Sequence, residues 1–178
     1  YNWDLKKHYY TSAKDPQIEK DATAYEKVTA KFARTYKDGK FVGKAATLQR
    51  ALKDYEELCG NPLAAKIIRY FSFRTTLDVN DTEAAKQLAM YTERLKKAGN
   101  QTIFFTLVLG TLPKQKQKGY LKDPLLAEYK YFLQRVFLSA KYDLSEAEEK
   151  ILSRVQQTSS DMWADATEKI LGNRTITF

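Results

Sequence analysis

The chain has 178 residues, of which 43% are hydrophobic, so it can form one globular domain with a substantial core and is not a disordered chain. It contains 7 Gly and 4 Pro, and so few turn-forming residues favour long helices. Cys59 is the one cysteine, which excludes an intrachain disulfide. Since His8 is the one histidine, an ordinary His- or Cys-rich zinc site built from this chain alone is excluded as well.

The net charge is +8, carried by Lys and Arg residues that are mostly interleaved with Asp and Glu. The dense exception is KQKQK at residues 114–118, which we interpret as a solvated basic loop. The longest apolar run, residues 103–109, is far shorter than the ~20 residues that span a bilayer, and no secretory signal is visible. We therefore expect a cytoplasmic protein with no membrane partner, and the interleaved charges disfavour nucleic acid as a partner.

Residues 1–14 form a leader rich in aromatic and basic side chains, which we expect to lie on the surface of this domain or of sequence outside the chain. Asp15 and Pro16 begin the first predicted helix, because proline favours the first helical position. Gly39 follows its end. Its predicted inward stripe consists of Ile18, Ala22, Tyr25, Thr29, Phe32 and Tyr36.

A second predicted helix follows Gly43, and a third follows the strong turn signal at residues 59–62. Helical spacing predicts the inward residues of the second helix as Leu48, Leu52, Tyr55 and Leu58. Those of the third are Leu63, Ile67, Ile68, Phe71 and Leu77.

The longest predicted element is a helix over residues 82–112, which Gly99 and Asn100 can kink without resetting its phase. About thirty helical residues would extend ~45 Å at 1.5 Å per residue. Its inward residues are predicted as Ala84, Leu88, Tyr91, Leu95, Ala98, Thr102, Phe105, Leu109 and Leu112. Across the basic loop, a helix begins at Pro124, and we expect it to pack antiparallel to the long one. Its inward residues are predicted as Leu126, Tyr129, Leu133, Val136 and Phe137.

The sequence pattern of residues 142–171 predicts two more helices. Asp143 or Ser145 can cap the first, and the spacing of Ser145 and Glu148 is that of a capping box. Polar residues 158–161 break this helix and cap the next, which ends at Gly172. We expect Trp163 to be buried against neighbouring helices. The tail, residues 174–178, alternates polar and apolar residues and predicts a short strand. The expected fold is therefore all-α, with about six helices and a long antiparallel pair.

The segment LSEAEEKIL at residues 144–152, a short gap of Thr and Ser, and then Trp163 on an amphipathic helix resembles the end of the N-terminal helical region of oligoendopeptidase F. The opening Trp3-Asp4-Leu5 and the helix start DPQIEKD at residues 15–21 are similar to the beginning of that region. These enzymes are zinc metallopeptidases of the thimet oligopeptidase-like group. The resemblance implies that residues 1–178 are a single helical domain at the N-terminus of a longer protein.

In that family the zinc ligands, an H-E-x-x-H motif and a later Glu, lie in a catalytic domain that follows the helices. The chain has no such motif, nor a G-x-S-x-G, Walker A or G-x-G-x-x-G sequence. We therefore assign it no catalytic, cofactor-binding or metal-binding residue, and the zinc belongs to the parent enzyme. The resemblance implies one wall of a channel for oligopeptide substrates, with the missing catalytic domain as partner. Candidate substrate-entrance residues are Lys114, Lys116 and Lys118.

An alternative hypothesis is a stand-alone basic helical module that binds an acidic partner or nucleic acid. The source reading frame separates the two hypotheses. An H-E-x-x-H motif downstream favours the peptidase, and a stop codon after Phe178 favours the module.

Overall fold

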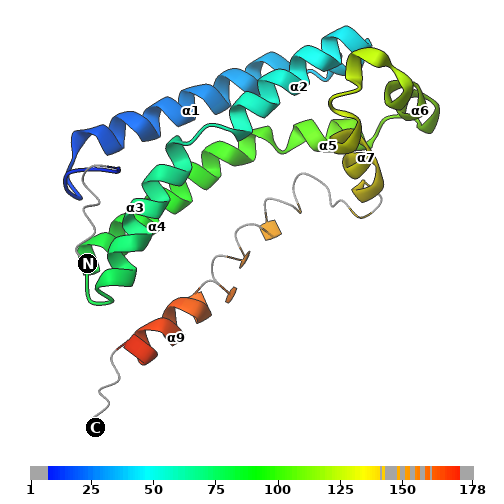
Figure 1. The fold of residues 1–178 in the computed structure, drawn as a ribbon. Coiled ribbons are helices and arrows are strands. Elements are labelled where there is room, and N and C mark those ends of the chain that lie inside the picture. The colour runs from blue at the N-terminus through cyan, green and yellow to red at the C-terminus, as the bar shows by residue number, and fades with distance from the viewer. Residues whose placement is uncertain are drawn as a thin grey trace. The chain divides into compact units, whose positions relative to one another are not determined.

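The computed structural model describes residues 8–140, 142, 148, 151–152, 155–156, 159–160 and 162–172. These residues contain helices and turns but no strand, which confirms the all-α prediction (Figure 1). The predicted C-terminal strand lies outside the described residues, as do Asp143 and Ser145 of the predicted helix cap. None of the described helices is both long and apolar enough to cross a membrane.

The helices follow one another in an order close to the predicted one. They are α1 (Pro16–Tyr36), the 3-10 helix η2 (Lys40–Val42), α2 (Ala45–Cys59), α3 (Leu63–Leu77), α4 (Thr82–Gly99), the 3-10 helix η3 (Asn100–Thr102), α5 (Phe104–Gly110), α6 (Lys114–Lys122), the 3-10 helix η4 (Pro124–Leu126), α7 (Lys130–Ser139) and α9 (Met162–Gly172).

Both ends of α1 lie where the sequence predicts them. The Asp15 carboxylate accepts the backbone N–H of Gln17 at 2.9 Å, which satisfies a donor that the first helical turn leaves free. After the helix, Gly39 has a φ of 72°, a left-handed conformation that glycine adopts without steric cost. The predicted stripe is confirmed, since every member except the half-buried Tyr25 is buried.

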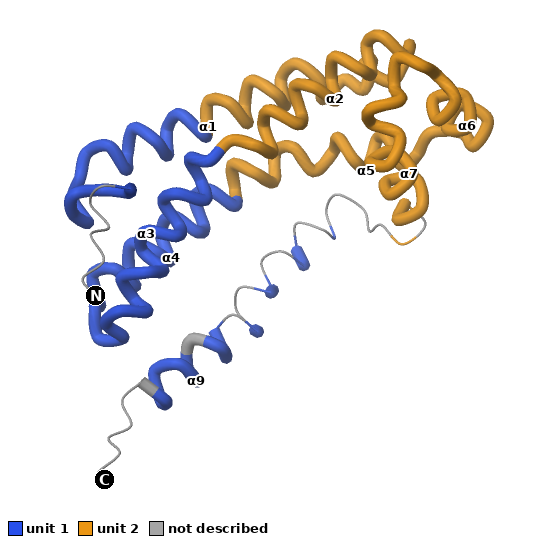
Figure 2. The backbone as a smooth tube through the Cα atoms, in the orientation of Figure 1, with its two compact units in different colours: residues 1–25, 62–96, 147–178 blue, residues 26–61, 97–146 orange. Residues whose placement is uncertain are grey.

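The chain divides into two compact units (Figure 2). Unit 1 comprises residues 1–25, 62–96 and 147–178, and unit 2 comprises residues 26–61 and 97–146. Helix α1 contributes its first residues to unit 1 and the rest to unit 2. The prediction of one domain stays a prediction, because a compact unit is not by itself an independently folding domain.

The core of unit 1 includes a residue of the leader, as the aromatic content of that segment suggested. Tyr10 is 1% exposed, and its hydroxyl donates to the buried Asp21 carboxylate at 2.8 Å. Gln17 donates to the same carboxylate at 2.6 Å, and Lys66 of α3 lies 3.4 Å from it. A buried carboxylate is tolerated when it is hydrogen-bonded and paired in this way. The surrounding buried residues are Ile18, Ala22, Ile67, Tyr70, Phe71, Ala84, Tyr91 and Leu95.

The core of unit 2 is built around Phe105 of α5, which is fully buried. Its ring stacks on Phe41 with 4.8 Å between centroids and on Tyr55 with 4.5 Å, and it meets Phe32 edge-on at 5.3 Å. Offset-stacked and edge-on aromatic pairs contribute beyond the area that they bury. This cluster connects α1, η2, α2 and α5 within one core.

The long helix predicted over residues 82–112 is interrupted. The 3-10 turn η3 separates α4 from α5, and the hydroxyl of Thr102 donates to the carbonyl of Gly99 at 2.8 Å within it. Gly99 and Asn100 are poor helix formers, which explains why the tighter turn forms at this point. The predicted phase is nevertheless retained across the turn, since Leu95, Phe105 and other predicted inward residues are buried. Helix α5 packs against α7, the partner that the sequence predicted.

Two predicted burials are wrong. Leu77 is 74% exposed, because it is the last residue of α3 and the chain turns away directly after it. Trp163 is 76% exposed on α9, where Met162 and Ile170 are exposed as well. Helical spacing correctly predicts α9 and its end at Gly172. It shows which residues share a face, however, and not whether another segment covers that face.

Replacing Phe105 with Ala should lower the free energy of unfolding by about 3–5 kcal/mol, because the cavity would lie in the aromatic core of unit 2. Replacing Trp163 with Ala should change it by less than about 0.5 kcal/mol, because little of its side chain is buried. Urea unfolding of the two variants and the parent tests both values. A large loss for the Trp163 variant would contradict the exposed position.

Candidate functional site

The lysine-rich run that the sequence predicted as a loop is helix α6. Pro113 precedes it, with φ −56° and ψ 139°, and its carbonyl accepts the backbone N–H groups of Lys116 and Gln117 at 2.8 and 3.0 Å. The side-chain amide of Gln117 donates to the carbonyl of Leu112 at 2.8 Å. The loop prediction was wrong because it weighed charge above propensity, and Lys and Gln are good helix formers.

The three candidate entrance residues do not share one face of α6. Lys114 and Lys118 are exposed and lie about one turn apart, and Lys122 is exposed one turn further on. Lys116 is half-buried, and its ammonium group lies 5.9 Å from the centroid of the Tyr120 ring. Within the described part of the chain, no carboxylate lies within salt-bridge distance of Lys114, Lys116 or Lys118. Lys114 and Lys118 are therefore accessible to an anionic ligand, whereas Lys116 in part supports the helix.

Tyr120 attaches α6 to the segment between α1 and α2. Its ring is buried, and its hydroxyl donates to the carbonyl of Val42, in η2, at 2.6 Å. Burial, together with the nearby negative charge of Asp123, raises the pKa of Tyr120 above its ordinary value. The hydroxyl therefore remains a neutral donor at physiological pH, as the carbonyl acceptor requires.

Two further hydrogen bonds attach the segment after α6 to α2. The amide of Gln49 donates to the carbonyl of Leu125 at 2.8 Å, and the hydroxyl of Tyr129 donates to the Glu56 carboxylate at 2.8 Å. Asp123 accepts the backbone N–H of Leu125 at 2.9 Å and so caps η4. The predicted inward residues of this segment are confirmed, with Leu126 and Leu133 fully buried.

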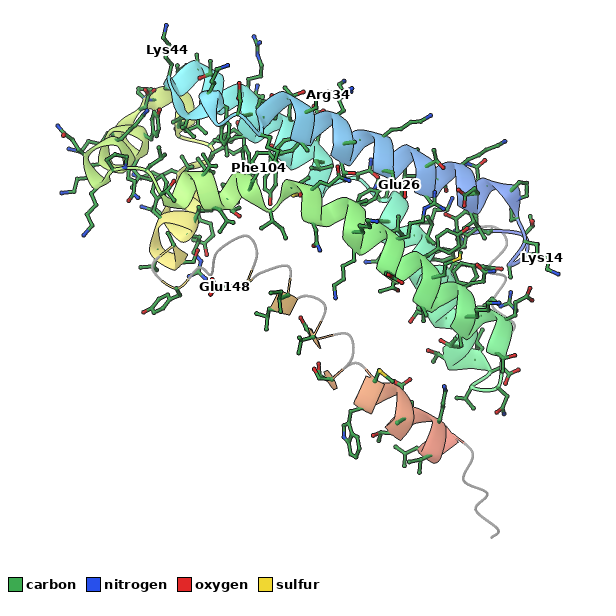
Figure 3. All side chains as sticks on the ribbon, turned by 180° about the vertical axis from the view of Figure 1, so that it is seen from behind. Lys14, Glu26, Arg34, Lys44, Phe104 and Glu148 are labelled. Atoms are coloured by element: carbon green, nitrogen blue, oxygen red, sulfur yellow. The ribbon has the colours of Figure 1, made fainter. Side chains whose placement is uncertain are left out.

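The contact between α6 and η2 brings a second group of lysines close to the predicted one. Residues 37–44 carry Lys37, Lys40 and Lys44, all exposed, and Lys44 extends away from the helices of unit 2 (Figure 3). We call residues 37–44 and 114–122 together the basic end. Sequence reasoning missed the first segment because its lysines are spaced apart around the glycine turn. These lysines join the predicted group only through the long-range hydrogen bond of Tyr120, and no local sequence pattern reveals that bond.

Zinc, which the resemblance implies for the parent enzyme, does not fit the described residues. They contain no group of three or more His, Cys, Asp or Glu side chains that could hold a metal ion. His8 and Cys59 are both exposed.

Comparison with protein families gives one match. Residues 109–173 match the family model described as Oligopeptidase F, a model of the N-terminal domain of M3 peptidases. The matched segment includes α6, η4, α7 and α9. It therefore contains Tyr120 and Tyr129, whose hydrogen bonds reach Val42 in η2 and Glu56 in α2. The match confirms the resemblance drawn from the sequence. No curated protein and no solved structure matches the chain.

Tyr129 should make the stability of the chain sensitive to alkaline pH. Burial, and then its hydrogen bond to Glu56, raises the pKa of Tyr129 from 10.0 to about 12. The folded state thus favours the neutral phenol more than the unfolded state does. The stability that Tyr129 contributes is therefore complete below pH 10 and is lost as the pH rises towards 12. Tyr129→Phe should cost about 1 kcal/mol at neutral pH and should lose less stability than the parent between these values.

Tyr131→Phe is the matched control, because this side chain lies two residues after Tyr129, in α7, and is 74% exposed. It should match the parent at neutral pH and over the alkaline range. Urea unfolding at several pH values measures all three proteins. Parallel alkaline losses in the parent and the Tyr129 variant would show that the Tyr129 hydroxyl is not held in this way.

Proposed function

We propose, from the match of residues 109–173 to the family model described as Oligopeptidase F, that the chain forms one wall of the substrate channel of a zinc-dependent, cytoplasmic M3 peptidase that degrades oligopeptides. The family match is the observation that carries this proposal. In it, the zinc and the residues that hydrolyse the peptide bond belong to a catalytic domain, which is a partner of the helices described here. The chain itself admits and orients the peptide.

The way in which the unit 2 part of the matched segment is attached supports a wall rather than a moving part. Tyr120, Gln49 and Tyr129 connect it to η2 and α2 by hydrogen bonds that span 73 to 78 residues of sequence. Leu126 and Leu133, fully buried in the core of unit 2, add apolar contacts to these bonds. A wall that keeps its position can select substrates by size and charge without taking part in the chemistry.

Lys114, Lys116 and Lys118 remain the proposed entrance residues, with Lys114 and Lys118 in the accessible positions. No acidic residue lies in the first turn of α6, so the positive end of the helix dipole adds to the lysine charges. In the proposal this charge attracts peptides with acidic residues or a free carboxyl terminus. The attraction is modest and is screened by salt.

The test is peptide hydrolysis by the chain joined to its catalytic domain. Replacing Lys114, Lys116 and Lys118 with Gln should raise KM for acidic peptides severalfold and leave kcat unchanged, because binding is lost equally from the ground state and the transition state. A triple variant with Gln at Lys27, Lys53 and Lys97, which are exposed lysines of unit 2 outside the basic end, is the control and should keep the parent KM.

Two results would count against the proposal. A lower kcat with unchanged KM would remove the admission role from α6. Peptide hydrolysis that is absent, or that persists when a chelator removes zinc, would reject the assignment to a zinc peptidase.

A further inference from the structure

The positive charge of the chain is concentrated in one unit. Unit 2 holds sixteen Lys and Arg residues against nine Asp and Glu, a net charge of +7, whereas unit 1 holds fourteen against thirteen, a net charge of +1. Nearly all of the net charge of +8 therefore belongs to unit 2. Its effect on a charged partner depends on whether it is spread over the unit or gathered in one region.

Within unit 2, the basic end combines seven lysines with one acidic residue, Asp38. Asp38 pairs with Lys40 at 2.9 Å. The next acidic residue, Asp123, follows the basic end and caps η4. The hydrogen bond between Tyr120 and Val42 holds the two lysine-bearing segments together. The lysines are Lys37, Lys40, Lys44, Lys114, Lys116, Lys118 and Lys122, of which all but Lys116 are exposed.

We propose that the basic end is a binding surface for an acidic polypeptide segment, with the row Lys114, Lys118 and Lys122 as its main contact and Lys37 and Lys44 as a second contact. Along α6 the row repeats every four residues, or roughly 6 Å. Residues on one side of an extended chain repeat every second residue, or about 7 Å. Alternate carboxylates of an extended Asp- or Glu-rich segment can therefore meet successive lysines of the row.

The composition of the surface favours a polypeptide over nucleic acid. Single-stranded nucleic acid binds on exposed aromatic side chains that stack with the bases, and the two aromatic residues of the basic end, Phe41 and Tyr120, are buried. The basic end also contains no arginine, the side chain that best forms paired hydrogen bonds with phosphate and with bases. Lysines act instead as mobile point charges, which suits a flexible run of carboxylates.

The experiment measures binding of a fluorescently labelled oligoglutamate to the 178-residue chain by anisotropy, at low and at physiological ionic strength. Oligoglutamine and oligothymidylate of the same length serve as comparison ligands. We expect oligoglutamate to bind, more weakly as salt is added, and to bind more tightly than either comparison ligand. Binding of this kind requires no catalytic domain, so its outcome is independent of the outcome for the peptidase proposal.

Three variants locate the surface. The first variant replaces Lys114, Lys118 and Lys122 with Gln. It should raise Kd for oligoglutamate about tenfold, since three exposed ion pairs are lost. The second variant replaces Lys37 and Lys44 with Gln, and it should raise Kd about threefold. The control with Gln at Lys27, Lys53 and Lys97 removes the same charge as the first variant from elsewhere in unit 2 and should change Kd less than about twofold. Glutamine is a good helix former, and unchanged unfolding midpoints would confirm that the variants fold.

Each other outcome overturns the proposal. Equal losses in the first variant and the control would mean that only net charge matters. No binding of oligoglutamate, or equal binding of oligoglutamine, would mean that the basic end does not recognise acidic polypeptides. Tighter binding of oligothymidylate would identify nucleic acid as the partner instead.

Discussion

The hydrogen bond from the hydroxyl of Tyr120 to the carbonyl of Val42 is the contact on which the arrangement of unit 2 depends. It joins residues 78 positions apart, and a buried tyrosine without an acceptor would be costly, so the bond sets where α6 lies against η2. The bonds of Gln49 and Tyr129 fix the following segment to α2 in the same way. Phe105 completes this core from α5.

This attachment determines what the matched segment packs against and which lysines lie near those of α6. The matched residues 109–173 begin at the end of α5, so the part of the segment that belongs to unit 2 packs on helices formed earlier in the chain. Because α6 lies against η2, the lysines of both segments form one basic end. The same contact thus supports both proposals, a wall that stays in place and a surface that attracts acidic chains.

Much of the fold could be predicted because helices are local. The stripe from Ile18 to Tyr36 and the inward residues of α4, α5 and α7 follow from spacing alone. The errors lie where a local pattern was outweighed or incomplete. The lysines of α6 suggested a loop, although their helix propensity is high, and the spacing around Trp163 indicated a face but not a partner. Of the candidate site, only the lysines of α6 could be predicted from the sequence. The contribution of Lys37 and Lys44 depends on a tertiary contact.

Hydrogen exchange of the α6 amides, in the parent and in a Tyr120→Phe variant, tests the central claim that this helix is held by its bond to η2. In the parent these amides should be protected as strongly as those of α2. In the variant their protection should fall about fivefold, because one net hydrogen bond is lost, while α3 in unit 1 stays unchanged. Unprotected α6 amides in the parent, or equal protection in both proteins, would contradict the claim.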